Sequence, residues 1–143
     1  MKQMPTEQAK KSPQKNTVTS RKYGGLSLEE RKRQRRAKFL AAGLCVFGSS
    51  GYRQSSVRRL CKEAQLTDRY FYEACGNLET LLVDVYQECM SKLGKKILAA
   101  VSDNFRMSKN PESAIIAGLN AFFDALENQQ VARVCMIELE GLN

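Results

Sequence analysis

Four consecutive residues, Thr67 to Tyr70, carry side chains that could contact the bases or the backbone of DNA. Arg69 is the strongest candidate, because a guanidinium can donate two hydrogen bonds at once to O6 and N7 of guanine. Asp68 could accept from N4 of cytosine, or it could only satisfy a helix dipole. Thr67 could cap a helix, contact a phosphate, or do both, and Tyr70 could contact a thymine methyl group or the DNA backbone. This stretch therefore predicts contact with DNA.

Two short helices joined by a tight turn are predicted to position these residues, within Gly51 to Asn77. Ser55 and Ser56 are good caps for the first helix, and Thr67 is expected to cap the second. Gln65 and Leu66 are expected to form the turn. Two helices with so short a connection form a helix-turn-helix, whose second helix can lie in the major groove. The first helix has its apolar face at Val57, Leu60, Cys61 and Ala64.

Residues 36–82 also resemble the DNA-binding domain of the tetracycline-repressor (TetR) family of bacterial transcriptional regulators. The order and spacing of several short motifs carry this resemblance. They are RAKFLAAGLCVF (36–47), Gly51-Tyr52, Ser55-Ser56-Val57, Leu60 with Ala64, Leu66-Thr67, Phe71-Tyr72, and Glu79 with Leu81-Leu82. The resemblance implies a dimeric repressor that a small-molecule effector releases from DNA.

The resemblance adds three residues to the candidate DNA-binding set. It implies that Ser56 and Arg58 contact the backbone or a base, and that Tyr72 contacts phosphate. Family members usually have a small residue where Gln65 stands and often have a lysine where Leu78 stands, so the phosphate grip is expected to differ here. The full set is Ser56, Arg58, Thr67, Asp68, Arg69, Tyr70 and Tyr72.

The 143 residues suit one domain, or a small head with a short body, and their charge is unevenly spread. Residues 1–38 hold twelve Lys and Arg against three Asp and Glu, whereas residues 78–143 hold six against nine. A basic front is typical of contact with a polyanion, although a solubilising tail would look the same.

We expect an all-α fold: a three-helix head containing the helix-turn-helix, followed by a partial helical body. Residues 1–26 are predicted to be a disordered basic tail, 27–77 the DNA-binding domain, and 78–143 an incomplete regulatory or dimerisation domain. Ser27 with Glu30 predicts a capping box, and Asn110 with Pro111 predicts another helix start. Residues 128–130 are expected to be a polar connection, and the remaining segment is expected to be a helix.

Other function classes receive less support. An enzyme is not expected, because the chain has no histidine, nucleotide-binding loop or metal-ligand cluster, and no cofactor is expected. Five cysteines without zinc-like spacing, and no apolar run long enough for a membrane span, favour the reducing cytoplasm. A thiol sensor is a weaker alternative, in which Arg58 and Arg59 would lower the pKa of Cys61.

The sequence therefore predicts a cytoplasmic, sequence-specific DNA-binding regulator, most simply a repressor that excludes polymerase. Its expected partners are double-stranded DNA, a small-molecule effector, and either a second copy or a longer relative; no membrane partner is expected. The alternative is a truncated family member that no longer reads DNA and acts through protein contacts, since large exposed apolar surfaces usually mark a partner.

Overall fold

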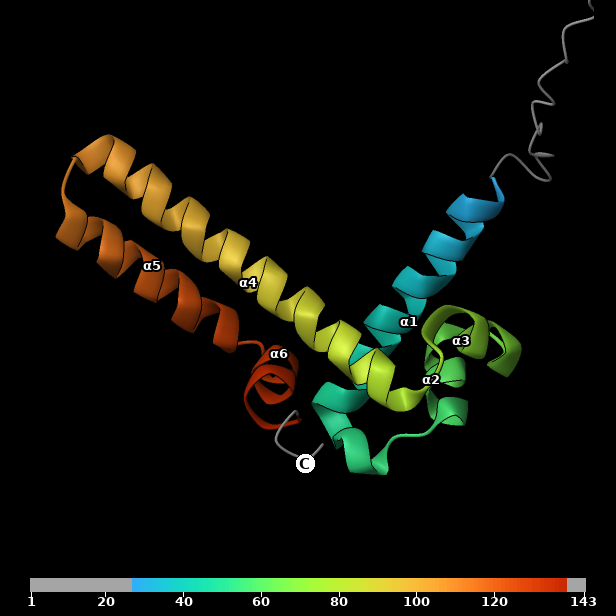
Figure 1. Cartoon of the computed structure of the whole chain (residues 1–143). Coiled ribbons are helices and arrows are strands. Elements are labelled where there is room, and N and C mark those ends of the chain that lie inside the picture. Colours follow the sequence, from blue (N-terminus) through green and yellow to red (C-terminus); the bar gives the residue numbers. More distant parts are fainter. Residues whose placement is uncertain (1–26, 139–143) are drawn as a thin grey trace, which may run out of the picture.

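The computed structural model describes residues 27–138, and this part of the chain is all-α, with no strand. Figure 1 shows a head of three helices from which a long helical hairpin extends. The predicted fold class is confirmed, whereas the predicted tail, residues 1–26, lies outside the described residues. The elements in order are α1 (Leu28–Ser50), the 3-10 turn η1 (Tyr52–Gln54), α2 (Val57–Ala64), α3 (Asp68–Cys75), α4 (Leu78–Ser108), α5 (Pro111–Leu126), α6 (Gln129–Arg133) and the π-helical turn η2 (Val134–Glu138).

Helix α1 begins with the capping box that the sequence predicts. The Ser27 hydroxyl accepts from the Glu30 amide at 3.1 Å, and the Glu30 carboxylate accepts from the Ser27 amide at 2.9 Å. The hydrogen bonds from Ser27 lower the pKa of the Glu30 carboxyl. Farther along α1, Arg36 bonds the carbonyl of Ala74 at 3.3 Å and pairs with Asp84 at 3.0 Å. This half-buried guanidinium therefore ties α1 to the end of α3 and to α4.

Helices α2 and α3 form the predicted helix-turn-helix. Gln65 ends α2 in the left-handed conformation, with φ of 55°, and its backbone turns the chain toward α3. Phe71 is fully buried, and its ring meets the ring of Phe39 edge-on at 5.4 Å. The expected cap by Thr67 is wrong: its side chain makes no capping hydrogen bond, although it occupies the N-cap position. The Thr67 hydroxyl is therefore not used to begin α3.

One hydrophobic core joins the head to the end of the described chain. Phe39 and Phe47 of α1, Leu60 of α2 and Val85 of α4 are buried in the same cluster as Val134 of η2. The core therefore crosses the predicted boundary between residues 77 and 78.

The prediction of a polar connection at residues 128–130 is also wrong. Asn128 caps α6 by accepting from the amides of Gln130 and Val131, so Gln129 and Gln130 already belong to the helix. A short polar run that begins with asparagine can be a loop or a helix start, and the packing of η2 on α1 selects the helix.

Helices α4 and α5 form an antiparallel hairpin that extends from the head (Figure 1). Asn77 caps α4 by accepting a hydrogen bond from the Thr80 amide at 2.8 Å. Lys109 ends α4 in the left-handed conformation, and Asn110 with Pro111 begins α5 as predicted. No helix among residues 27–138 is long and apolar enough to cross a membrane.

Substitution by alanine at two helical glycines is expected to change the free energy of unfolding in opposite directions. A Cβ on Gly48 would lie 2.7 Å from the Cα of Gln130, so Gly48→Ala should force α1 and α6 apart and lower the free energy of unfolding by about 1–3 kcal/mol. A Cβ on Gly94 would meet nothing within 4 Å, so Gly94→Ala should raise it by about 0.5–1 kcal/mol. Urea unfolding of both variants measures these changes, and a stabilising Gly48→Ala would refute the close α1–α6 contact.

Candidate nucleic-acid interface

Helix α3 presents one face outward and buries the other. Phe71 and Cys75 are buried, whereas Arg69, Tyr72 and Glu73 are exposed. The 100° step between successive helical residues places Arg69 between Tyr70 on one flank and Tyr72 on the other. The outward face of the second helix therefore carries the predicted base-reading arginine with an aromatic side chain on each side.

Arg69 is held in place by one exposed ion pair. Its Nε donates to the Glu73 carboxylate at 2.9 Å, and 83% of the arginine side chain is exposed. This hydrogen bond raises the pKa of the Arg69 guanidinium above its usual range. An exposed intrahelical pair is weak because water and salt screen it. DNA can therefore compete for this guanidinium, as a base-reading role requires.

Tyr70 turns toward α1, where it meets a group of cations. The Arg35 guanidinium lies over the Tyr70 ring, 4.5 Å from its centroid, in a cation–π contact. Beside it, a cleft of about 430 Å³ separates the first half of α1 from the end of α3. The residues that line this cleft are Lys32, Arg33, Arg35, Arg36, Glu73 and Ala74. Tyr70 is thus half-buried next to a positive cleft, which suits a backbone contact better than a base contact.

The remaining predicted residues of α3 differ in what they are free to do. Asp68 is exposed in the first turn of α3, where its carboxylate suits the helix dipole and can also accept a hydrogen bond from outside. Thr67 is exposed and makes no cap, so a phosphate contact remains for its hydroxyl. Tyr72 is 59% exposed and borders a groove with Tyr52 and Asn77. Its ring also meets the buried Phe71 ring edge-on at 5.5 Å.

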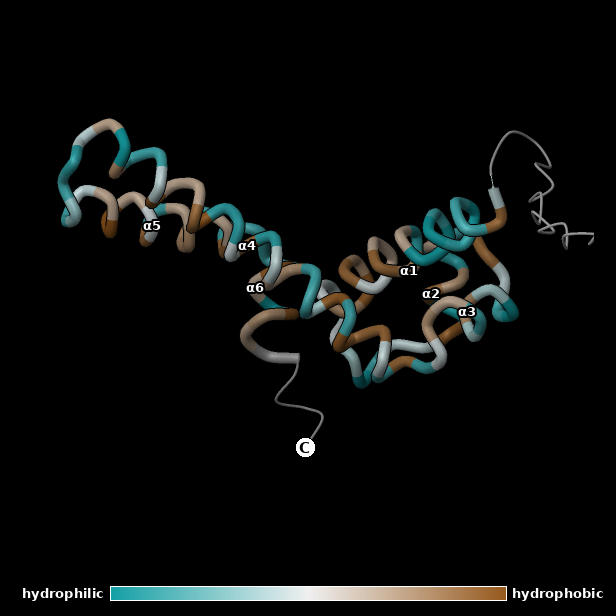
Figure 2. Tube along the Cα trace, turned by 45° about the horizontal axis from the view of Figure 1, so that its top comes forward, coloured by the Kyte–Doolittle hydropathy of each residue, from teal (hydrophilic) through white to brown (hydrophobic). Residues whose placement is uncertain are grey.

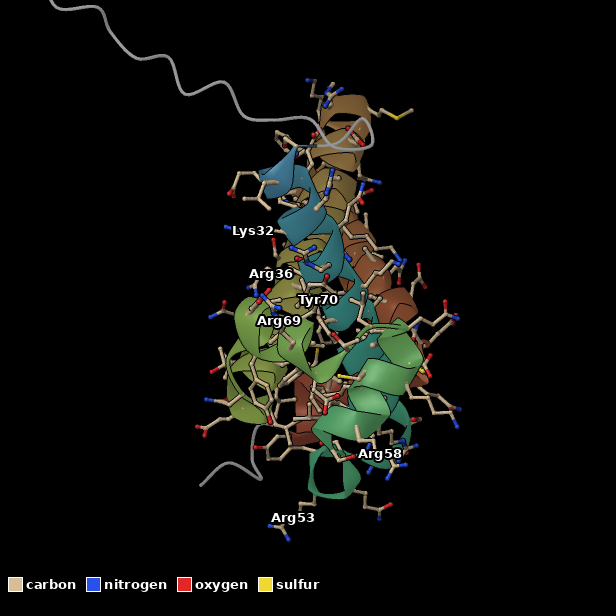
Figure 3. All side chains as sticks on the ribbon, turned by 90° about the vertical axis from the view of Figure 1, so that its right-hand side faces the viewer. Lys32, Arg36, Arg53, Arg58, Arg69 and Tyr70 are labelled. Atoms are coloured by element: carbon tan, nitrogen blue, oxygen red, sulfur yellow. The ribbon has the colours of Figure 1, made fainter. Side chains whose placement is uncertain are left out.

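Helix α2 and η1 extend the same surface. Ser56 caps α2 by accepting from the Arg59 amide at 3.3 Å, while Arg58 is exposed. Figure 3 shows Lys32 and Arg36 at one end of this surface, Arg69 and Tyr70 in the middle, and Arg58 with Arg53 at the other end. The candidate interface therefore runs from α1 across α3 to α2 and η1.

The sequence analysis does not predict a role for Arg53, and it includes Lys32 and Arg35 only among the basic residues of the segment 1–38. Arg53 lies in η1, the short turn that begins directly after the glycine at the end of α1, and its side chain is exposed. The feature of the sequence that could have indicated Arg53 is its position just before the first helix of the helix-turn-helix. The contact of Arg35 with Tyr70 joins residues far apart in the chain, so no local pattern could have revealed it.

The cysteine thiols are poor candidates for a sensor. Burial, together with the hydrogen bond to Asp68, raises the pKa of Cys61 to about 11, and burial raises the pKa of Cys75 to about 11. The suggestion that Arg58 and Arg59 activate Cys61 is therefore wrong: neither arginine lowers its pKa here. The thiolate, which is the nucleophile, is scarce at neutral pH.

Alkylation of the native protein measures this directly. At mildly alkaline pH, iodoacetamide should spare Cys61 and Cys75 until urea unfolds the chain, as read by mass spectrometry. Because folding raises both pKa values, the native state holds these protons more tightly. The associated stability is complete below the ordinary value of 9.0 and declines as the pH rises toward 11. Native-state labelling of Cys61 at the rate of a free thiol would contradict the burial.

A second concave region lies in the body. A cleft of about 340 Å³ opens between α1, α4, α5 and α6, with Leu44, Val85 and Leu93 on its apolar side and Lys92 and Asp124 among its charged residues. Its size falls at the lower end of small-molecule sites. A small amphiphilic molecule bound in this cleft would meet both apolar and charged groups.

Residues 27–138 hold no group of His, Cys, Asp and Glu side chains that could bind a metal ion.

In comparisons with known proteins, no protein-family model and no curated protein matches the chain.

Proposed function

We propose that this chain is a DNA-binding transcriptional regulator whose α3 enters the major groove. The observation that carries the proposal is the outward presentation of Arg69 on the second helix of a helix-turn-helix, between two tyrosines and flanked by cations from α1, α2 and η1. Guanidinium groups are the commonest readers of guanine in that groove. The role is binding, with no catalytic step.

The surface divides naturally into reading and positioning groups. Arg69 is the base reader, because it is the outward cation of α3. Arg53, Arg58 and Lys32 flank it on three other elements, where they would contact the phosphate backbone and set the register of α3. Thr67 and Tyr72 would add hydroxyl contacts to phosphate. Repression follows sterically, because a protein seated on a promoter excludes polymerase.

The resemblance of residues 36–82 to the TetR family supports the same proposal and refines it. It suggests a cytoplasmic repressor that binds as a dimer to a two-fold operator and leaves DNA when an effector binds. The body cleft lined by Leu44, Val85 and Lys92 is the region we propose for that effector. Binding there would act on the packing of α4 against α1, which carries the head.

Salt-dependent binding to duplex DNA tests the proposal. Fluorescence anisotropy would compare the wild type with an Arg53→Gln, Arg58→Gln double variant. The control is Lys95→Gln with Lys96→Gln, which removes two exposed cations from the middle of α4. The head variant should weaken binding to all sequences and reduce the slope of log affinity against log salt by about 2. Equal effects of the two double variants would mean that the head does not hold the DNA.

The alternative function, a protein-interaction module that no longer reads DNA, is favoured by one observation. Large apolar side chains of α4 and α5 are exposed, among them Leu98 at 67% and Phe123 at 63%. Absence of any binding to duplex DNA in the assay above, with intact far-UV circular dichroism, would select this alternative.

A further inference from the structure

Helix α5 buries its small residues and exposes most of its large ones. On α5, the residues packed against α4 are Ala114, Gly118 and Ala121, and a Cβ on Gly118 would lie only 2.7 Å from Cγ2 of Val101. Because burial of apolar surface stabilises a fold in proportion to area, a helix of a self-sufficient hairpin would place its large residues inside. The arrangement here leaves most of the apolar area of α5 outside the hairpin.

The large apolar residues of α5 form one continuous face. Ile115, Leu119 and the half-buried Phe122 recur at the three- and four-residue spacing of one side of α5, with Ile116 and Phe123 next to them. Leu98 and Phe105 of α4 are seven residues apart, on the side of α4 that continues this face across the antiparallel pair. Figure 2 shows the hydrophobic colouring along α5 in contrast to the hydrophilic first half of α1. We call these seven residues the hairpin face.

The area of the hairpin face matches what a symmetric dimer needs. Six of its residues are exposed by 46–67%. At about half exposure each, they present on the order of 600 Å² of apolar surface, as much as the largest patch on a typical monomer. Two copies would bury about 1,200 Å² in total, which reaches the size class of specific, stable interfaces.

Charge also favours a second copy as the occupant. From Ile115 to Phe123, α5 carries no charged residue. In a two-fold interface, the same patch meets itself, so any charge near the axis would face a like charge. An uncharged face avoids this repulsion, whereas a partner of a different kind would usually be selected by complementary charge.

We propose that the hairpin face pairs two copies of this chain, with α5 of one copy against α5 of the other. This pairing would supply the two-fold protein that a two-fold operator requires, and so it deepens the proposed function. Only the biological role of the dimer rests on the proposed function. The surface itself is argued from the hairpin alone. Each hairpin extends away from its own head, so the hairpin face lies apart from α3 and leaves it exposed (Figure 1).

Sedimentation equilibrium without DNA tests the pairing. The chain has a mass of 16.1 kDa, and at micromolar concentration the wild type should sediment at twice that mass. Leu119→Glu, at a position exposed in the single chain, should halve the observed mass by placing two carboxylates at the interface. Met107→Glu is the matched control, because Met107 is 88% exposed but lies on the opposite side of α4. It should remain a dimer.

Two results would overturn the proposal. A wild type that sediments as a single chain, or as a polydisperse aggregate, would show that the hairpin face does not pair two copies. A Leu119→Glu variant that remains dimeric with unchanged circular dichroism would place the interface elsewhere. Because DNA is absent, either failure leaves the proposed DNA binding untouched, and a failure to bind DNA leaves the sedimentation result intact.

Discussion

Phe71→Ala is expected to lower the free energy of unfolding by about 3–5 kcal/mol, the cost of removing a fully buried aromatic side chain. The Phe71 ring fills the space between α3 and α1, where it meets Phe39. Its loss leaves a cavity under α3. For a domain whose total stability is about 5–15 kcal/mol, this change removes a large share of it. Urea unfolding followed by far-UV circular dichroism measures the change.

The neighbouring residue gives a matched control. Tyr72 is similar in size but 59% exposed, and its ring touches Phe71 only at the edge. Tyr72→Ala should therefore cost no more than about 1.5 kcal/mol, the upper value of an aromatic pair. It should nevertheless weaken DNA binding, because the hydroxyl is lost. Equal losses of stability in the two variants would contradict the placement of α3 on the core.

Arg69→Ala is expected to reduce affinity for a preferred site by about 10- to 100-fold while changing affinity for random DNA much less. The physical reason is that a guanidinium reads guanine through two hydrogen bonds, whereas a phosphate contact is the same on every sequence. Anisotropy titrations on the preferred duplex and on a scrambled duplex measure the two affinities.

Two further variants separate reading from charge. Arg69→Lys keeps the positive charge but loses the paired donors, so it should lose specificity while keeping the salt dependence. Glu73→Gln removes the negative charge that pairs with Arg69 at 2.9 Å, so specific affinity should be unchanged or higher. Equal weakening of the preferred and scrambled duplexes by Arg69→Ala would assign Arg69 to the phosphate backbone instead.

Local signals in the sequence predicted most of the helices correctly. The caps at Ser27, Asn77 and Asn110 depend on a side chain and an amide two or three residues away, so short patterns were enough. The turn at Gln65 also depends on local backbone geometry, because the residue at this position has a left-handed conformation. Such a conformation favours a small residue, which is what the TetR resemblance implies at this position.

The failures have non-local causes. Thr67 stands at a cap position, but whether its hydroxyl caps depends on its rotamer. The raised pKa of Cys61 comes first from burial, which no neighbour in the sequence reports. The cation–π contact of Arg35 with Tyr70 depends on how α1 crosses α3. The large apolar residues of α5 recur at helical spacing in the sequence, but only the packing of Gly118 on Val101 shows that they face outward.

Selection of random duplex DNA by the purified chain near physiological salt tests the central claim most directly, with Arg69→Ala carried through the same rounds. If α3 reads bases, selection should recover a two-fold motif, and Arg69→Ala should relax a guanine position in each half of that motif. Recovery of unselected sequence, with binding that only falls steeply with salt, would contradict this claim. In that case the cations of the head would grip phosphate, but α3 would not read bases.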